Sequence, residues 1–259
     1  MKFTNVRVFN FENAFRGMRN PKESYHLIDS YFGIECDWEN AIARSNGQLY
    51  VEIYRDNDCF EFASIGPKDM DLAQRLINAG SEHRKFLRQI QVSVDITAPL
   101  YWWKEFDTYK VGTTANSTST MHKLTSKPIT LDCFEIDDFE NVPYPTDVQR
   151  TDAKGYADSD FIQIHLIPYL EYLRQKYLET NDKVYWKELV RWLPESWLQT
   201  RTITMNYENL YSIIRQRSSH KLTEWHSFID FVKTLPYAED LIFYNKANWL
   251  GTLFDFIKK

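Results

Sequence analysis

The chain has 259 residues, of which 43% are hydrophobic and 26% are charged, a composition typical of a globular protein that buries a core. Its 31 Lys and Arg stand against 36 Asp and Glu, so the formal net charge of −5 offers no overall positive field for binding a nucleic-acid backbone. Its 8 glycines lie no closer than 14 positions apart, which excludes the two glycine-rich phosphate loops G-x-G-x-x-G and G-x-x-x-x-G-K-[ST].

Cysteine and histidine usage points to no redox or metal chemistry. Cys36, Cys59 and Cys133 are far apart and odd in number, which argues against a disulfide framework and a thiolate metal site. The six histidines form no helix-face ligand pair, so no metal site is expected. The start of the chain lacks the pattern of a signal peptide, and no apolar run approaches the roughly 18 residues of a membrane helix. We expect a soluble cytoplasmic protein.

The first predicted elements are a hairpin and a helix. Residues 49–54 and 59–63 are β-rich runs that flank the turn-forming triplet 56–58. After Pro67, residues 68–79 carry apolar side chains at helical spacing and stop at Gly80, a residue common just after helix ends.

A strand, a helix and an irregular segment are predicted next. Residues 90–97 alternate apolar and polar side chains, which is the pattern of a strand with one buried face. Ala98-Pro99 ends this strand, and residues 100–107 read as a helix. Residues 126–160 combine three prolines with nine acidic residues and predict a long irregular acidic loop, either functional or a solvated insertion.

The C-terminal third is predicted to be helical, with amphipathic stretches at 161–179, 183–193, 206–217 and 223–235. We therefore expect an α+β fold: a single domain over residues 1–259, with a small antiparallel sheet packed by helices.

Two segments carry residues suited to nucleotide chemistry. The stretch 98–121 runs from strand to aromatic helix to a series of Ser, Thr and Asn, whose neutral donors suit a phosphate or sugar, although a solvated polar loop explains the composition equally well. The second segment, 191–225, contains several arginines. Arg217 lies near a helix end, where it is either a ligand anchor or an ordinary surface arginine.

Together the two segments resemble the flavin-dependent thymidylate synthase family (ThyX type), over roughly residues 71–236, with residues 1–66 only loosely matched. The family's Arg-His-Arg motif and the following Ser-x-Asn-x-x-Ser-x-Arg correspond to residues 108–110 and 114–121. Matching positions are Lys110, Asn116, Ser119, Arg191, Asn206 and Arg217, with His220 and Trp225 each within one residue of the family's His and Trp.

The resemblance implies reductive methylation of dUMP at C5, with methylenetetrahydrofolate as carbon donor, FAD as the hydride carrier and NADPH as reductant. It assigns Arg217 as the catalytic residue, which stabilises negative charge on the uracil ring. The implied substrate-binding residues are Arg191, Asn116, Ser119 and Arg217. The implied cofactor-binding residues are Thr108, Lys110, Asn206 and His220. The resemblance also implies a homotetramer whose active sites are built from several chains.

The sequence departs from the family at three signature arginines, which are Thr108, Met121 and Glu208 here. Lys123, Arg88, Trp102 and Trp103 are candidates for compensating contacts with the flavin. Three hypotheses follow: a divergent flavin-dependent enzyme that transfers a methyl or hydroxymethyl group to a pyrimidine nucleotide; a non-catalytic nucleotide-binding or assembly protein; and a structural paralogue in which Arg217 is an ordinary ion pair.

Overall fold

The computed structural model describes residues 1–35, 50–54, 59–119, 123–136 and 162–245. The chain forms two compact units. Unit 1 comprises Met1–Lys2, Ile96–Thr108 and Asn116–Arg201, and unit 2 comprises Phe3–Asp95, Tyr109–Ala115 and Thr202–Lys259. The expectation of a single domain over the whole chain stays a prediction.

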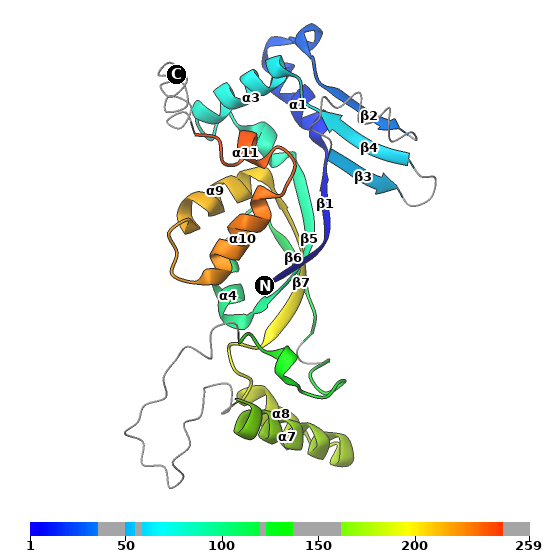
Figure 1. The fold of residues 1–259 in the computed structure, drawn as a ribbon, viewed down its shortest axis with the longest axis vertical. Coiled ribbons are helices and arrows are strands. Elements are labelled where there is room, and N and C mark those ends of the chain that lie inside the picture. Colours follow the sequence, from blue (N-terminus) through cyan, green and yellow to red (C-terminus); the bar gives the residue numbers. More distant parts are fainter. Residues whose placement is uncertain (36–49, 55–58, 120–122, 137–161, 246–259) are drawn as a thin grey trace, which may run out of the picture. The chain divides into compact units, whose positions relative to one another are not determined.

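Helices and strands alternate along most of the described chain (Figure 1). The strands are β1 (Lys2–Phe9), β2 (Tyr31–Glu35), β3 (Tyr50–Tyr54), β4 (Cys59–Ser64), β5 (Gln91–Pro99), β6 (Thr114–Ser117) and β7 (Leu198–Asn206). The α-helices are α1 (Phe11–Arg19), α3 (Pro67–Asn78), α4 (Leu100–Phe106), α7 (Ile167–Thr180), α8 (Lys183–Arg191), α9 (Tyr207–Arg217), α10 (Thr223–Lys233) and α11 (Ala238–Leu241). Shorter turns are η1 (Asn20–Lys22), η2 (Tyr25–Leu27), η3 (Lys85–Arg88), η4 (Leu131–Cys133) and the π-helical η6 (Ile162–Leu166).

The strands form two sheets, one of four strands in the order β1-β5-β7-β6 and one of three strands in the order β2-β4-β3. The predicted hairpin is confirmed, because β3 and β4 pair antiparallel with Tyr50 opposite Ala63. The predicted strand β5 is also confirmed: Val92, Val94 and Ile96 are fully buried, and the residues between them are partly exposed. The α+β class and a small antiparallel sheet are therefore as predicted.

The helices predicted from apolar periodicity are present, with shifted ends. Helix α3 begins at Pro67, and the Asp29 carboxylate accepts hydrogen bonds from the backbone N–H groups of Lys68 and Asp69 at its first turn. The stretch predicted from 161 contains the π-helical turn η6, which ends two residues before Pro168, in the first turn of α7. Proline has no N–H to donate, so the helix departs from α geometry near this residue.

Several elements were not predicted: β1, α1, β2, β6 and β7. Strand β7 does alternate, with Gln199, Ile203 and Met205 buried, but a glutamine and threonines interrupt the apolar pattern that would have revealed it. Within the Ser/Thr-rich segment, residues 114–117 are solvent-exposed, as the solvated-loop alternative expects, but they form the strand β6. Within the acidic segment 126–160, residues 137–160 lie outside the described part of the chain.

The core of unit 2 is aromatic. Phe11 packs edge-on against Tyr207 at 5.8 Å between ring centroids, and Phe15 packs against Phe86 at 5.9 Å. Beside these rings, Arg19 and Asp69 form a buried ion pair with a 2.5 Å contact. Asp69 also accepts hydrogen bonds from the backbone around residue 30, so the fully buried carboxylate is satisfied.

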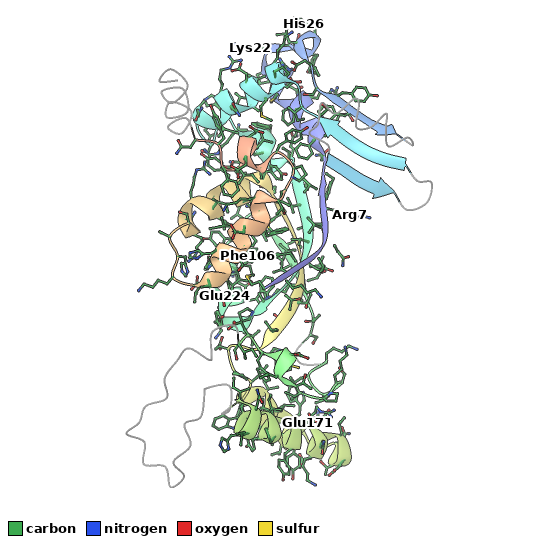
Figure 2. All side chains as sticks on the ribbon, viewed as in Figure 1. Arg7, Lys22, His26, Phe106, Glu171 and Glu224 are labelled. Atoms are coloured by element: carbon green, nitrogen blue, oxygen red, sulfur yellow. The ribbon has the colours of Figure 1, made fainter. Side chains whose placement is uncertain are left out.

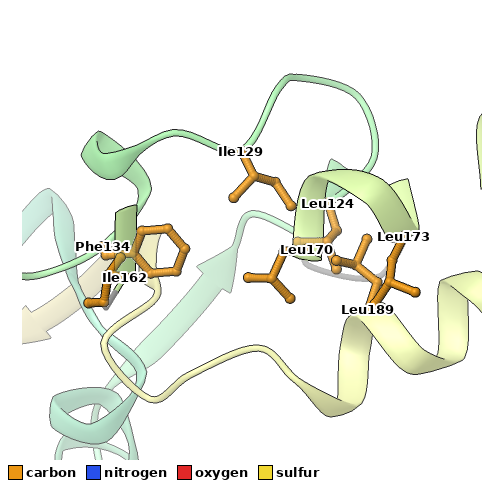
Figure 3. Close-up of a cluster of buried hydrophobic side chains, with 7 residues drawn as sticks. All are labelled: Leu124, Ile129, Phe134, Ile162, Leu170, Leu173 and Leu189. Carbon is orange, nitrogen blue, oxygen red and sulfur yellow. The ribbon is translucent and has the colours of Figure 1, made fainter. Parts of the chain in front are cut away.

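Unit 1 has its own apolar cluster, in which α7 and α8 contact the segment 124–134. Its buried members are Leu124, Ile129, Phe134, Ile162, Leu170, Leu173 and Leu189 (Figure 3). Each such fully buried side chain contributes about 1.5–3 kcal/mol relative to an exposed one. Across the described residues, no helix combines the length and apolar character needed to cross a bilayer.

Two tryptophans of α4 belong to the interior of unit 1. Trp102 and Trp103 are fully buried, and the Trp103 indole N–H donates to the carbonyl of Gln199 at 2.9 Å. The Arg201 guanidinium lies 4.3 Å from the Trp103 ring centroid. The interpretation of these tryptophans as flavin contacts was therefore wrong, because neither exposes a surface to a ligand.

Candidate functional site

The start of α9 and the loop 109–113 form the first part of the candidate site, in unit 2. Asn206 caps α9 by accepting from the N–H of Asn209 at 3.0 Å, and Asn209 accepts in return from the N–H of Asn206 at 3.1 Å. The Asn209 amide also donates to the carbonyl of Val111 at 2.7 Å. This bond ties the loop that carries Lys110 to the helix N-terminus.

Gly112 allows the close approach of loop and helix. It has a φ of +76°, and a Cβ atom at this position would lie 3.0 Å from side-chain atoms of both Asn206 and Asn209. A residue without a Cβ is therefore needed on two grounds, backbone conformation and space.

Arg217, near the other end of α9, lies between two aromatic rings. Its Nε donates to the hydroxyl of Tyr109 at 2.7 Å, and its guanidinium carbon lies 4.7 Å from the Trp225 ring centroid and 5.5 Å from that of Tyr109. His220 packs edge-on against Trp225 at 6.2 Å, and its Nδ1 accepts from the N–H of Leu222 at 3.2 Å. The structure thus brings together Arg217, His220 and Tyr109, the first residue of the loop that carries Lys110.

Glu208, in the first turn of α9, is paired with a cation that the sequence had not singled out. The Nε of Arg84 donates to both of its carboxylate oxygens, at 2.8 and 3.0 Å. Both side chains are largely buried, with exposed fractions of 16% for Arg84 and 13% for Glu208. The Arg84 guanidinium also lies 4.2 Å from the Tyr211 ring centroid. The Glu208 carboxylate is therefore neutralised from within unit 2.

A second guanidinium, that of Arg215, lies 3.2 Å from the same Tyr211 ring. Burial lowers the pKa of Arg215 below its ordinary value, and the nearby positive charge of Arg84 lowers it further. Arg215 donates to three backbone carbonyls, those of Tyr211, Ile242 and Tyr244. Its role within unit 2 is therefore to hold residues 242–244 against α9.

Unit 2 also contains a cavity of about 710 Å³ beside α1, η1 and α3. Its apolar wall includes Met18, Leu72, Leu76, Ala79 and Phe86, and its basic groups are Arg19, Lys22, Arg75, His83 and Lys85. Lys22 lies at the end of the unit that carries α1 and α3 (Figure 2). Glu82 is the one acidic residue among those that line the cavity. An apolar wall with an excess of cations suits a flat ring system that carries phosphates.

Two of these basic groups already have acidic partners in the fold. Arg19 is held by Asp69, and Arg75 lies 2.8 Å from Asp71 in an exposed pair. Lys85 contacts Glu82 only loosely, at 3.9 Å. Lys22, Lys85 and His83 are therefore the side chains best placed to bind an anion in the cavity.

The remaining predicted residues belong to unit 1. Thr108 donates its hydroxyl to the carbonyl of Glu105 at 2.7 Å, at the end of α4. Asn116 is exposed on β6, and Ser119 accepts at its carbonyl from the N–H of Lys123 at 3.0 Å. Arg191, at the end of α8, forms an exposed ion pair with Glu188.

The structure therefore divides the predicted site. Lys110, Asn206, Arg217 and His220 belong to unit 2, whereas Thr108, Asn116, Ser119 and Arg191 belong to unit 1. Their assigned roles stay predictions. The sequence analysis did not identify the basic run His83-Arg84-Lys85, which follows Gly80. Three consecutive basic residues after a helix end were a visible, if weak, signal.

Comparison with solved structures identifies the fold. The chain is similar to flavin-dependent thymidylate synthase ThyX from Helicobacter pylori complexed with FAD and dUMP, with a TM-score of 0.57, 17% sequence identity, and coverage of 93% of this chain and 98% of the other. A second structure of ThyX from this organism with FAD and dUMP matches with a TM-score of 0.58 and 16% identity, covering 93% of this chain and 97% of the other. No protein-family model and no curated protein matches the sequence. The fold is thus ThyX-like.

Proposed function

We propose that this chain is a divergent flavin-dependent transferase that adds a methyl or hydroxymethyl group to C5 of a pyrimidine nucleotide, with dUMP as the first substrate to test. The observation that carries the proposal is the arginine Arg217, held between Tyr109 and Trp225 in a ThyX-like fold. In the resembled family an arginine at this place contacts the pyrimidine ring.

Arg217 supplies the chemistry through charge. A guanidinium at the edge of a uracil ring stabilises the negative charge that develops on N3 and on the carbonyl oxygens, and this makes C5 more nucleophilic. No nucleophilic side chain is needed. A guanidinium held in place before the substrate arrives stabilises this charge without reorganising during the reaction.

The residues of unit 2 fit a flavin dinucleotide. Lys22, His83 and Lys85 bring positive or hydrogen-bonding groups to a cavity of about 710 Å³, a size typical of sites for ligands of this kind. The family resemblance assigns Lys110, Asn206 and His220 as further cofactor contacts, although none of the three lines this cavity. When bound, FAD supplies the reducing equivalents for the transferred carbon, with NADPH as their source and methylenetetrahydrofolate as carbon donor.

Arg191, Asn116 and Ser119 are proposed to hold the nucleotide phosphate through charge-assisted and neutral hydrogen bonds. We propose that the chain assembles into a homo-oligomer, a homotetramer by the family resemblance. In such an assembly these residues of unit 1 and Arg217 of unit 2 need not come from the same chain to serve one site. Arg191 is exposed, so it is accessible to a nucleotide bound by a neighbouring subunit.

The test begins with purified full-length protein. We expect a visible flavin spectrum as isolated or after addition of FAD, and release of tritium from C5-tritiated dUMP when methylenetetrahydrofolate, FAD and NADPH are supplied. Arg217→Gln should abolish the release, whereas Arg16→Gln, an exposed arginine on α1, should leave it unchanged. Protein that stays colourless and does not quench added FAD would rule out the flavin enzyme.

A second candidate is a non-catalytic nucleotide-binding or assembly protein with the same fold. Two positions at which the resembled family has arginine favour it: here Glu208 is engaged with Arg84, and the Thr108 hydroxyl is engaged with the backbone of Glu105. This candidate predicts that dUMP binds without turnover, so a measured turnover would remove it.

A further inference from the structure

Tyr109 and Arg217 are joined by a short hydrogen bond that spans 108 positions of the chain. The Nε of Arg217 donates to the phenol oxygen of Tyr109 at 2.7 Å, the length of a charge-assisted hydrogen bond. Nε carries one hydrogen, and this bond uses it. Any contact between Arg217 and a ligand must therefore be made by its terminal nitrogens.

The direction of the phenol hydrogen supports this bond. The Tyr109 hydroxyl donates to Oε1 of Gln216 at 3.3 Å, and an amide oxygen can only accept. With its hydrogen turned toward Gln216, the hydroxyl presents a lone pair to Arg217. The three side chains thus form a chain of hydrogen bonds in which Arg217 donates to Tyr109 and Tyr109 donates to Gln216.

Aromatic packing restricts the same side chain. The Tyr109 and Trp225 rings are 6.0 Å apart at an interplanar angle of 75°, and the Arg217 guanidinium lies near both. Trp225 is fully buried, so its ring is a fixed support. An arginine has several rotatable bonds, and holding it in one conformation removes an entropic cost from ligand binding.

We propose that Tyr109 is the positioning residue for Arg217: its hydroxyl fixes the plane of the guanidinium so that the terminal nitrogens meet the anionic edge of a pyrimidine base. This inference rests on the proposed function. Tyr109 stands at the centre of the segment 108–110, where the resembled family has histidine.

A double-mutant cycle tests it, with the dissociation constant for dUMP measured by calorimetry on full-length protein. We expect Tyr109→Phe, which removes only the hydroxyl, to weaken dUMP binding about tenfold, the effect of losing one charge-assisted interaction. In an Arg217→Gln background the same change should alter binding less than twofold, because its effect acts through Arg217. A hydroxyl with a merely structural role would weaken binding by the same factor in both backgrounds, and the two substitutions would then act additively.

Tyr207→Phe is the matched control. It also removes a phenol hydrogen bond in unit 2, from Tyr207 to the carbonyl of Pro236 at 2.6 Å, and should lower the thermal midpoint while leaving dUMP affinity unchanged. Should Tyr109→Phe fail to fold, Gln216→Ala, on an exposed residue, replaces it and is expected to weaken binding two- to threefold through the freed phenol.

The outcomes separate two kinds of failure. If the unaltered protein binds dUMP and the Tyr109 variant binds it equally well, or if the two substitutions act additively, the positioning role is overturned and the proposed function stands. If the unaltered protein does not bind dUMP even at millimolar concentration, the proposed function and this inference fall together.

Discussion

Glu208 receives both of its hydrogen bonds from Arg84 through a single nitrogen, Nε, at 2.8 and 3.0 Å. The two residues are 124 positions apart, and both are largely buried. At a position where the resembled family carries a cation that holds the flavin, unit 2 therefore carries an anion and supplies the cation from a different segment. The pair is neutral overall, so this position carries no net positive charge.

Removing one partner of this pair should destabilise the protein. Glu208→Ala leaves the Arg84 guanidinium largely buried without its acceptor, and we expect a loss of about 2 kcal/mol in the free energy of unfolding. Glu208→Arg should cost at least as much, because it places a third guanidinium beside Arg84 and Arg215. Denaturant titration measures both, and a loss below about 0.5 kcal/mol for either variant would show the pair to be energetically neutral.

The reversed pair should recover stability and change cofactor affinity. In Arg84→Glu combined with Glu208→Arg, the ion pair is restored with the cation on α9. We expect the unfolding free energy to return to within about 1 kcal/mol of the original and FAD to bind about tenfold tighter, as for one added charged contact. Fluorescence quenching of FAD reads the affinity. Unchanged affinity in a stable double variant would place the flavin away from α9.

The basic groups of the cavity beside α1 and α3 are expected to bind FAD. Lys22→Gln and Lys85→Gln should each weaken FAD binding about fivefold, the effect of about 1 kcal/mol per partly solvated charge contact, and raised salt should reduce the difference. Lys233→Gln is the control, since Lys233 pairs with Asp230 on the exposed side of α10. Equal affinities for all three variants would remove the cavity from the proposed site.

Gly112 should be intolerant of a side chain. Gly112→Ala places a Cβ at 3.0 Å from Asn206 and Asn209 in a left-handed conformation, whereas Gly80→Ala, at φ +110°, meets no atom within 4 Å. Both substitutions strain the backbone by about 1–2 kcal/mol, so the excess cost at Gly112 reports the steric contact with the cap. We expect an excess of about 1 kcal/mol by denaturant titration, and a weaker affinity for FAD only in the Gly112 variant. Equal costs at both sites would mean that the loop adjusts freely.

The stability of unit 1 should depend on pH in the acid range below the usual pKa of a glutamate. Hydrogen bonds from Arg174 at 2.6 and 2.8 Å lower the pKa of Glu171 from 4.5 to about 2, and the N–H of Ile129 adds a further donor. Because the pKa is lower in the folded state, the stabilisation is fully present above pH 4.5 and is lost as the pH falls toward 2.

The expected size of this loss is about 2–3 kcal/mol, measured by amide hydrogen exchange on α7. Glu171→Gln should lower stability at neutral pH and flatten the pH dependence in this window. Glu179→Gln is the control, since its pair with Lys176 is exposed. A pH profile that Glu171→Gln leaves unchanged would contradict the assignment.

Local signals predicted much of the secondary structure. The alternation in β5 and the apolar periodicity of α3, α9 and α10 are patterns within a short stretch of sequence. All four elements formed where these patterns predicted them. Strand β7 was missed because Gln199 is buried on the face where an apolar residue is expected; its amide donates to the carbonyl of Thr118 at 3.0 Å. Only a partner distant in sequence makes that burial favourable.

By itself, the sequence determined what kind of phosphate site this protein lacks: its eight widely spaced glycines exclude the two glycine-rich phosphate loops, so side chains are expected to supply most of the contacts to a nucleotide. The tertiary structure alone decided which side chains are available. Arg84 is committed to Glu208, and the Nε of Arg217 is committed to Tyr109, across 124 and 108 positions of the chain. The charge of an arginine is readable from the sequence, but the direction of its hydrogen bonds depends on acceptors that only folding brings near.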